Sequence, residues 1–228
     1  MPESTFKPFI LAADITELYD DVLFSAALEC VTDARKEKIS KLKLRKDKNL
    51  SLGAGLLLEQ AFKRAGIEKG EIIIGKNGKP YIKNSDFYFN LSHSGSFAIC
   101  AAAPYPIGCD IELREDVNLS IAERFFKSEE YEDIISDKNS TEKFYRYWTL
   151  KESFMKATGL GMSVPLDSFS VVLKNPPEIK SETVTEKYFF KEFFDISGYA
   201  CALCGKKDCS NTELILINDI KTLVGNDL

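Results

Sequence analysis

Hydrophobic and polar positions divide the chain into two stretches with a similar order of elements. In the first stretch, an apolar strand precedes three helices, and further strands follow them. The third helix shows leucines at helical spacing and stops before Gly66. The predicted strands are 9–13, 71–74, 87–91 and 97–103, with a turn at 76–80, and the predicted helices are 16–30, 33–48 and 50–65.

The second stretch begins after the Pro104-Tyr105-Pro106 break and repeats this order. Its predicted helices are 119–137 and 141–158, and its predicted strands are 107–113, 169–173, 188–194, 199–203 and 214–217. Helices and strands are grouped and do not alternate as βαβ units, so the pattern predicts an α+β fold. We expect two similar halves, 1–106 and 107–228, each with helices packed on a mainly antiparallel sheet.

Composition narrows the class of protein. The 228 residues carry 30 basic and 35 acidic side chains, a net charge of −5, which argues against a general nucleic-acid binder. No apolar run approaches ~18 residues, and the amino-terminal residues do not resemble a secretory signal, so no membrane association is expected. Six cysteines spread along such a chain are typical of reduced thiols. The expected location is cytoplasmic.

Three cysteines, Cys201, Cys204 and Cys209, have a spacing that faintly resembles a zinc site. A fourth ligand is missing nearby, and the single histidine of the chain is His93. Residues 198–204 read as a buried strand of small residues, where free cysteine is common. The buried strand is therefore favoured over a metal site.

Two carboxylates give the strongest local signal. Asp110 and Glu112 stand two residues apart in the apolar strand 107–113, so both side chains project from one face. Their repulsion would be costly without a cation or base between them. Mg²⁺ takes one or two protein carboxylates and fills its shell with water and phosphate oxygens. The alternative is a half-exposed strand with ordinary polar alternation.

A second signal lies in the helix that ends near Gly159. Spacing of four places Trp148, Glu152 and Lys156 along one stripe. The alternative is a solvated Glu–Lys pair with the tryptophan in the core. Apolar neighbours make most of this helix buried, however, and charges on a buried helix need partners.

The third signal is a strand that runs into a polar turn, Phe89 to Gly95, with the histidine in it. His93 would have to activate Ser92 or Ser94 in a nucleophilic triad, but adjacent residues of an extended chain point to opposite faces. A hydrolase triad is therefore disfavoured, and His93 is either a phosphate contact or a satisfied core histidine. No glycine-rich phosphate-loop pattern is complete in the sequence.

Together these fragments resemble the 4′-phosphopantetheinyl transferases of the surfactin-synthetase-activating type. The resemblance spans most of the chain. It is carried, in family order, by Arg35–Lys38, Gly78–Tyr81, Phe89–Ser94, Ile107–Glu112, Arg124–Phe126, Trp148–Lys156 and Pro165–Phe169. It implies two α+β halves in one chain, with coenzyme A and Mg²⁺, or Mn²⁺ in its place, bound in the cleft between them.

The resemblance also implies roles for individual residues. The implied metal ligands are Asp110, Glu112 and Glu152, one of which acts through water in some members. The residues implied to contact coenzyme A are Lys38, Lys79, Ser92, His93 and Lys156, with Arg35 and Ser51 near the 3′-phosphate. Family members often carry a basic residue where Leu50 stands here, so the adenine and 3′-phosphate contacts are the least defined part of the site.

The implied reaction transfers phosphopantetheine from coenzyme A to a serine of an apo peptidyl, aryl or acyl carrier protein. The serine attacks the β-phosphorus, and adenosine 3′,5′-bisphosphate leaves. Asp110, Glu152 and Lys156 are the implied catalytic residues. Either Glu152 or a metal-bound water takes the serine proton.

Two other functions use the same residues. A phosphohydrolase would activate water with these carboxylates, and a coenzyme A-binding module would bind without chemistry. Both halves lie in one chain, so a monomer is expected. Segment 33–48, with eight Lys and Arg residues, is either a docking face for an acidic carrier or a solvated helix face.

Overall fold

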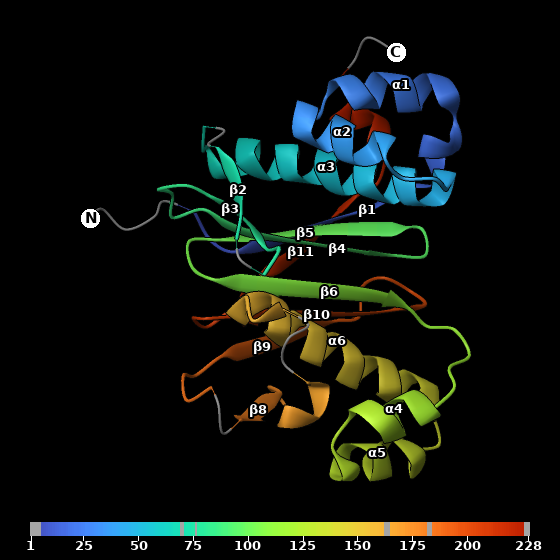
Figure 1. Ribbon diagram of the computed structural model, residues 1–228, viewed down its shortest axis with the longest axis vertical. Helices are drawn as coiled ribbons and strands as arrows, with labels where there is room; N and C mark the ends of the chain where they lie inside the picture. Colours follow the sequence, from blue (N-terminus) through green and yellow to red (C-terminus); the bar gives the residue numbers. More distant parts are fainter. Residues whose placement is uncertain (1–5, 69–70, 76, 162–164, 182–183, 226–228) are drawn as a thin grey trace.

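Two β-sheets lie face to face in the middle of the molecule, and helices cover the outer face of each (Figure 1). The computed structural model describes residues 6–68, 71–75, 77–161, 165–181 and 184–225. The strands are β1 (Phe9–Asp14), β2 (Ile72–Ile74), β3 (Pro80–Ile82), β4 (Tyr88–Ser94), β5 (Phe97–Ala103), β6 (Ile107–Leu113), β7 (Phe169–Val172), β8 (Glu178–Ser181), β9 (Phe189–Phe193), β10 (Tyr199–Gly205) and β11 (Glu213–Ile217). The α-helices are α1 (Asp21–Glu29), α2 (Asp33–Ser40), α3 (Arg45–Ala65), α4 (Ser120–Phe125), α5 (Ser128–Ile135) and α6 (Ser140–Thr158), and the short 3₁₀ helices are η1 (Thr16–Tyr19), η3 (Leu166–Ser168) and η4 (Ile220–Leu223).

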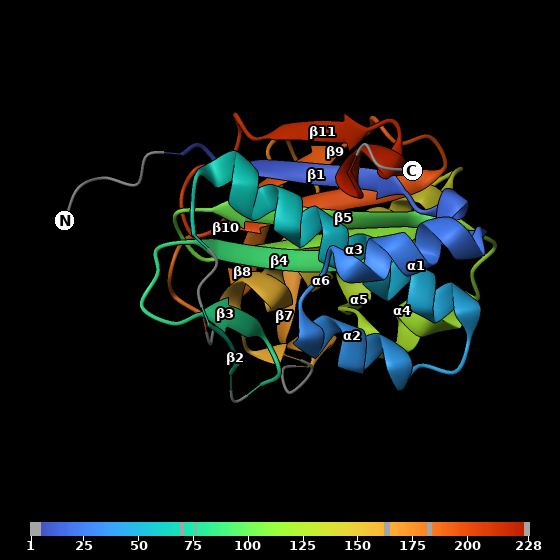
Figure 2. The same ribbon diagram turned by 90° about the horizontal axis from the view of Figure 1, so that it is seen from above.

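The first sheet has the strand order β11-β1-β5-β4, and the second has the order β6-β10-β9. Helices α1 to α3 cover the first sheet, and α4 to α6 lie on the far side of the second (Figure 1). Figure 2 shows the first sheet from its helical side, with the β2–β3 hairpin and α2 lying beyond its β4 edge. The sequence-based prediction of an α+β fold with two such halves is confirmed.

Burial on both faces explains why the central strands read as continuous apolar runs. In β1, Phe9 and Leu11 pack under the helices, whereas Ile10 and Ala12 enter the core between the two sheets. β5 divides its side chains between the same two cores. A strand buried on both faces shows no polar alternation, because neither face meets water.

Three predicted helices each divide into two, and the first of them, 16–30, contains η1 and α1. Segment 33–48 contains α2 and the start of α3, and Thr32 caps α2 by accepting the backbone N–H of Arg35 at 3.3 Å. Segment 119–137 contains α4 and α5, and the Glu130 carboxylate accepts the N–H of Lys127 at the start of α5 at 3.0 Å. The break within segment 33–48 lies at 41–44, between the end of α2 and the start of α3, where Leu44 provides no side-chain cap.

The carboxyl-terminal strand corrects the predicted division of the chain. β11 pairs in parallel with β1, with Ile10 opposite Leu214, and Ile220 of η4 enters the core beneath α1 to α3. Residues 213–223, which the prediction assigned to the half 107–228, therefore complete the first sheet. Without β11, the apolar strand β1 would be an unpaired sheet edge, and the pairing satisfies its backbone groups.

The cysteines at 201 and 204 lie in the buried strand β10, as predicted, and Cys209 is also buried. All three are free thiols. Among the described residues, no helix has both the length and the apolar character that a membrane span requires.

Candidate active site at the seam between the sheets

Side chains of β4 join it to β6 where the two sheets meet, and we call this line of contacts the seam. Alternate residues of β4 share one face and each reaches β6. Asn90 Oδ1 accepts the N–H of Cys109 at 2.9 Å, Ser92 Oγ donates to Asp110 Oδ1 at 2.8 Å, and Ser94 Oγ donates to Glu112 Oε2 at 2.8 Å. β4 continues as a strand to Ser94, so the prediction that His93 lies in a polar turn is wrong. The extension is what brings both serines to the β6 carboxylates.

Helix α6 lies close against β6 because of Gly108. A Cβ at this position would lie 2.2 Å from the Ser153 carbonyl oxygen and 2.3 Å from the Ala157 nitrogen, far inside any normal contact. Asp110 and Glu112 follow on the same face of the strand. The glycine therefore lets the helix approach, and the two carboxylates face that helix.

Lys156 of α6 reaches Asp110 across this contact. Its ammonium lies 2.6 Å from Asp110 Oδ1 and 3.1 Å from Ser92 Oγ. Burial has the largest single effect on the pKa of Lys156 and lowers it, but the charge of Asp110, its hydrogen bond and the other nearby negative groups together raise the pKa above its usual value. Asp110 is 2% exposed, and its second oxygen, Oδ2, has no hydrogen-bond partner among the described residues.

The three predicted metal ligands carry more negative charge than the site neutralises. Burial and the Asp110 charge raise the pKa of Glu112 to about 7, and the same two causes raise the pKa of Glu152. Within the described ranges, no three His, Cys, Asp or Glu side chains are close enough to hold a metal by themselves. Mg²⁺ needs only one or two protein carboxylates when phosphate supplies the rest. The buried, unpartnered Oδ2 of Asp110 and the mutual repulsion of the carboxylates fit such an ion.

Positive side chains gather beside the carboxylates. Burial, followed by the charges of Lys156, Lys38 and Arg35, lowers the pKa of His93, so all three cations lie within electrostatic reach of this imidazole. Burial likewise lowers the pKa of Arg35 and of Lys38. Among the described residues, neither Arg35 nor Lys38 has a carboxylate at ion-pair distance. We call Arg35, Lys38 and Lys156 the cationic cluster, and these three charges beside His93 suit an anion with several charges.

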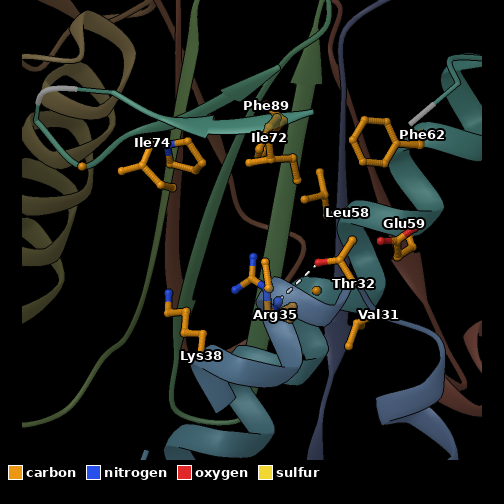
Figure 3. Close-up of a pocket in the computed structure, with 14 residues that line it drawn as sticks. Val31, Thr32, Arg35, Lys38, Leu58, Glu59, Phe62, Ile72, Ile74 and Phe89 are labelled. Carbon is orange, nitrogen blue, oxygen red and sulfur yellow. Dashed lines mark hydrogen bonds between the residues drawn. The ribbon is translucent and has the colours of Figure 1, made fainter. Parts of the chain in front are cut away.

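A cavity of about 360 Å³ opens next to the cationic cluster, between α2, α3 and the β2–β3 hairpin. In Figure 3, Arg35 and Lys38 extend from α2 on the same side, and Leu58, Phe62 and Ile72 form apolar walls. Gly55 belongs to the α3 wall, and a Cβ there would lie 3.1 Å from Arg35 Cγ. The cavity thus offers apolar surfaces with the two cations of α2 at one side and the Glu59 carboxylate also in its lining. Apolar walls with a few charged groups are a combination that suits a nucleotide.

Comparison with known proteins finds the same family that the sequence motifs resemble. Residues 20–105 match the family model described as the amino-terminal part of 4′-phosphopantetheinyl transferase, and residues 106–204 match that of the 4′-phosphopantetheinyl transferase superfamily. A 4′-phosphopantetheinyl transferase of Bacillus subtilis is 36% identical over 78% of this chain and 83% of its own length. The transferase Sfp of strain 168 is also 36% identical, over 76% of this chain and 81% of its own length. HetI of a Nostoc species is 35% identical over 60% of this chain and 62% of its own length.

The chain belongs to the 4′-phosphopantetheinyl transferase superfamily. It is therefore an enzyme, and the resemblance that the motifs predicted is confirmed. The boundary between the two family models, at 105 and 106, falls between β5 and β6, where the chain passes from one sheet to the other.

The transferase brings most of its predicted site residues together. Asp110, Ser92 and Lys156 are in direct contact at the seam. Glu112 and Glu152 are coupled to Asp110 by charge. The hydroxyl of Ser92 already bonds both neighbours, so in this arrangement it organises the charges of the site.

Ser51 and Lys79 were also predicted to contact coenzyme A, but they are not in direct contact with the carboxylates of the seam. Ser51 is buried in α3 one turn before Gly55, and its Oγ has no hydrogen-bond partner among the described residues. Lys79 turns its ammonium to backbone carbonyls, those of Ile107 at 3.0 Å, Lys156, and Ala157 at 3.3 Å. Burial lowers the pKa of Lys79 to about 8. The coenzyme A contacts predicted for these two residues stay predictions.

The transferase also uses residues that the sequence analysis did not select. Asn90 and Ser94 alternate with Ser92, and this period of two was a signal for a longer β4. Lys151 and Glu130 form an ion pair at 2.8 Å with both side chains almost completely buried, which joins α5 to α6 beside Glu152. Lys151 precedes the predicted site residue Glu152 in the sequence, but no sequence pattern indicated that it pairs with Glu130.

Five of the eight basic residues of segment 33–48 already have a role within the transferase. Three of its charges are in ion pairs, and two belong to the cationic cluster. The paired residues are Lys36 with Glu29, Lys41 with Glu37, and Arg45 with Asp21. The remaining residues are Lys43, Lys46 and Lys48. The docking role of this segment stays a prediction.

Proposed function

We propose that this transferase moves the 4′-phosphopantetheine arm of coenzyme A to a serine of an apo carrier protein, with Mg²⁺ or Mn²⁺, and releases adenosine 3′,5′-bisphosphate. The observation that carries the proposal is the position of Lys156. Its ammonium contacts Asp110 and also contributes to the positive field at His93, so it belongs both to the seam and to the cationic cluster. The diphosphate of coenzyme A needs this pairing of cations with metal-binding carboxylates.

The nucleotide end of coenzyme A fits the 360 Å³ cavity. The adenine is expected between apolar walls such as Leu58 and Phe62, and the 3′-phosphate beside Arg35 and Lys38. Gly78 and Pro80 of the hairpin line both this cavity and a second one of about 310 Å³ beside Glu152 and Lys156. A ligand that follows the hairpin would pass from the nucleotide pocket to the seam.

The carboxylates Asp110, Glu112 and Glu152 would hold the divalent cation, which supplies Lewis-acid stabilisation of charge on the phosphoryl oxygens when bound. Lys156 binds phosphate oxygens from the side of α6. Burial and the neighbouring cations lower the pKa of His93, which favours the neutral imidazole, and this form can donate or accept one hydrogen bond at the diphosphate.

The transfer step forms one bond and breaks another. The serine oxygen bonds to the β-phosphorus, and the bond from that phosphorus to the bridging oxygen breaks, so adenosine 3′,5′-bisphosphate leaves with the bridging oxygen. Glu152 accepts the serine proton in our proposal, because burial and Asp110 raise its pKa toward that of a useful base. The excess charge passes to the leaving group, where the cationic cluster stabilises it.

The acceptors are peptidyl, aryl or acyl carrier proteins. Both sides of the seam come from one chain, so we expect a monomer to be active. Lys43, Lys46 and Lys48, which have no ion-pair partner among the described residues, would attract an acidic carrier helix, and this attraction would weaken with salt.

The test is the intact mass of apo carrier proteins of the three classes after incubation with the transferase, coenzyme A and Mg²⁺. We expect a gain equal to one phosphopantetheine arm, and chelator should prevent it. Nucleotide or phosphate release without a carrier would indicate a hydrolase. No gain on any carrier from a folded protein that binds coenzyme A would leave a binding module and overturn the proposal.

A further inference from the structure

The β2–β3 hairpin of the first half reaches across the seam and contacts the end of α6. Lys79, the last residue before β3, donates to the carbonyl oxygens of Lys156 and Ala157, and Asn77 Nδ2 donates to the carbonyl oxygen of Gly159 at 2.8 Å. A helix leaves its last carbonyls without partners inside the helix. The hairpin therefore supplies, from a different part of the chain, the cap that the end of α6 needs.

The third acceptor of Lys79 lies on the second element of the site. Its ammonium also donates to the carbonyl oxygen of Ile107, the first residue of β6, at 3.0 Å. The next residue, Gly108, is where the backbones of β6 and α6 come closest. One ammonium thus holds the start of β6 to the end of α6 at their point of contact.

Both elements carry the charged groups of the site. Asp110 and Glu112 follow Gly108 on β6, and Glu152 and Lys156 lie in the last two turns of α6. A small shift or fraying of this helix end would move the Lys156 ammonium away from its 2.6 Å contact with Asp110. The position of the reacting groups therefore depends on how firmly this helix end is held.

We propose that Lys79 is a positioning residue that locks the end of α6 to the start of β6, and thereby sets the geometry of Lys156 and Glu152 relative to Asp110. Asn77 supports the same lock through its hydrogen bond to the carbonyl oxygen of Gly159. This role affects the chemical step. It differs from the direct coenzyme A contact that the family resemblance implies for Lys79. It rests on the proposed function for its kinetic consequence, but the structural lock itself can be measured without activity.

The conformation of the hairpin loop favours this contact. Gly75 N–H donates to the Lys79 carbonyl at 2.9 Å, and Gly78 has a positive φ of 80°, which glycine adopts without strain. The aliphatic stem of Lys79 passes the helix stop, since a Cβ on Gly159 would lie 3.7 Å from Lys79 Cδ. The described residues on either side of Lys79 thus place its side chain along the helix end.

The kinetic test compares Lys79→Met, which keeps the stem and removes the ammonium, with Lys83→Met, which removes an exposed lysine from the end of the same hairpin. Misplaced reacting groups lower kcat by about 10- to 100-fold, whereas the KM for coenzyme A should stay within about twofold. Lys79→Arg, which can donate to several carbonyls at once, should recover part of kcat. Lys83→Met should behave as wild type. A raised KM with kcat retained in Lys79→Met would place the residue in the nucleotide wall and overturn the proposal.

Hydrogen exchange provides the independent readout. Amides of the last two turns of α6 should exchange faster in Lys79→Met than in Lys83→Met, with exchange elsewhere unchanged. Asn77→Ala, an exposed substitution that should not prevent folding, should show a smaller change at the same amides. Unchanged exchange at the helix end in both variants would overturn the lock. Absence of phosphopantetheine transfer by wild type, together with faster exchange in the variants, would reject the proposed function and leave the lock intact.

Discussion

Asp110 places its two carboxylate oxygens in different surroundings. Oδ1 receives the ammonium of Lys156 at 2.6 Å and the hydroxyl of Ser92 at 2.8 Å, whereas the buried Oδ2 has no hydrogen-bond partner among the described residues. A buried oxygen of this kind costs free energy unless a donor or cation meets it. One residue can therefore anchor Lys156 and still offer an oxygen to a metal.

Replacing Asp110 should abolish transfer with little change in shape. Asp110→Asn keeps the volume but removes the charge that holds Lys156 and the metal, so we expect kcat/KM for carrier modification to fall at least about 100-fold. Asp116→Asn, which removes an exposed carboxylate just beyond β6, is the matched control and should retain activity. Comparable activity of the two variants would argue against Asp110 as a metal ligand.

Metal affinity can be measured apart from catalysis. Mn²⁺ titration followed by electron paramagnetic resonance should show one site in the presence of coenzyme A, weakened about tenfold or more in Glu112→Gln. Chelator should remove transfer activity, and added Mg²⁺ or Mn²⁺ should restore it. Activity that survives complete removal of divalent ions would contradict the proposed cofactor.

The two cations of α2 should affect substrate binding rather than chemistry. Lys38→Ala and Arg35→Ala each remove a charge beside the cavity, and we expect the KM for coenzyme A to rise about tenfold with kcat nearly unchanged. Lys41→Ala, whose ammonium is exposed and already paired with Glu37, is the control from the end of the same helix. With dephospho-coenzyme A, which lacks the 3′-phosphate, the KM should differ less between wild type and the two variants. An equal difference with both substrates would exclude a 3′-phosphate contact.

The close approach of α6 to β6 should make Gly108 sensitive to a single methyl group. The added Cβ of Gly108→Ala would meet backbone atoms at 2.2 and 2.3 Å, which cannot move aside as side chains do. We expect a loss of about 2–3 kcal/mol or more in the free energy of unfolding, measured with urea, and a loss of transfer activity. Gly66→Ala provides the contrast. Its Cβ meets nothing within 4 Å, so only its positive φ of 65° should cost about 1 kcal/mol, with activity retained.

The buried pair Lys151 and Glu130 should be far more sensitive to loss of one partner than of both. Lys151 donates at 2.8 Å to Glu130 and to the carbonyl oxygens of Leu166 and Phe169. Lys151→Met leaves a buried carboxylate, and we expect a loss of about 3–5 kcal/mol in the free energy of unfolding. Lys151→Met combined with Glu130→Gln removes both charges and should recover part of that loss in urea denaturation. A double variant no more stable than the single one would show that the backbone contacts of the two side chains, and not the uncompensated charge, account for the loss.

The local sequence pattern was sufficient to predict many of the strands and helices of this protein. Strand 107–113 and the helix that ends at Gly159 were predicted with their bounds nearly correct, because alternation and a glycine stop depend on neighbouring residues. The spacing of Asp110 and Glu112 placed both on one strand face for the same reason. The order of the motifs identified the superfamily before any contact was known.

Only the tertiary structure decided how distant segments meet. The pairing of β11 with β1 joins residues about 200 positions apart, and no local period indicates which strand edge a late apolar run will complete. Lys79 matched a family motif, yet its ammonium points to the carbonyls of α6 because the helix end lacks partners there. Asn90 and Ser94 acquired their role only when β4 came to lie beside β6. Residue types along the chain determined which elements form and what chemistry they carry, whereas unsatisfied backbone groups and buried charges in the folded molecule decided which side chain meets which.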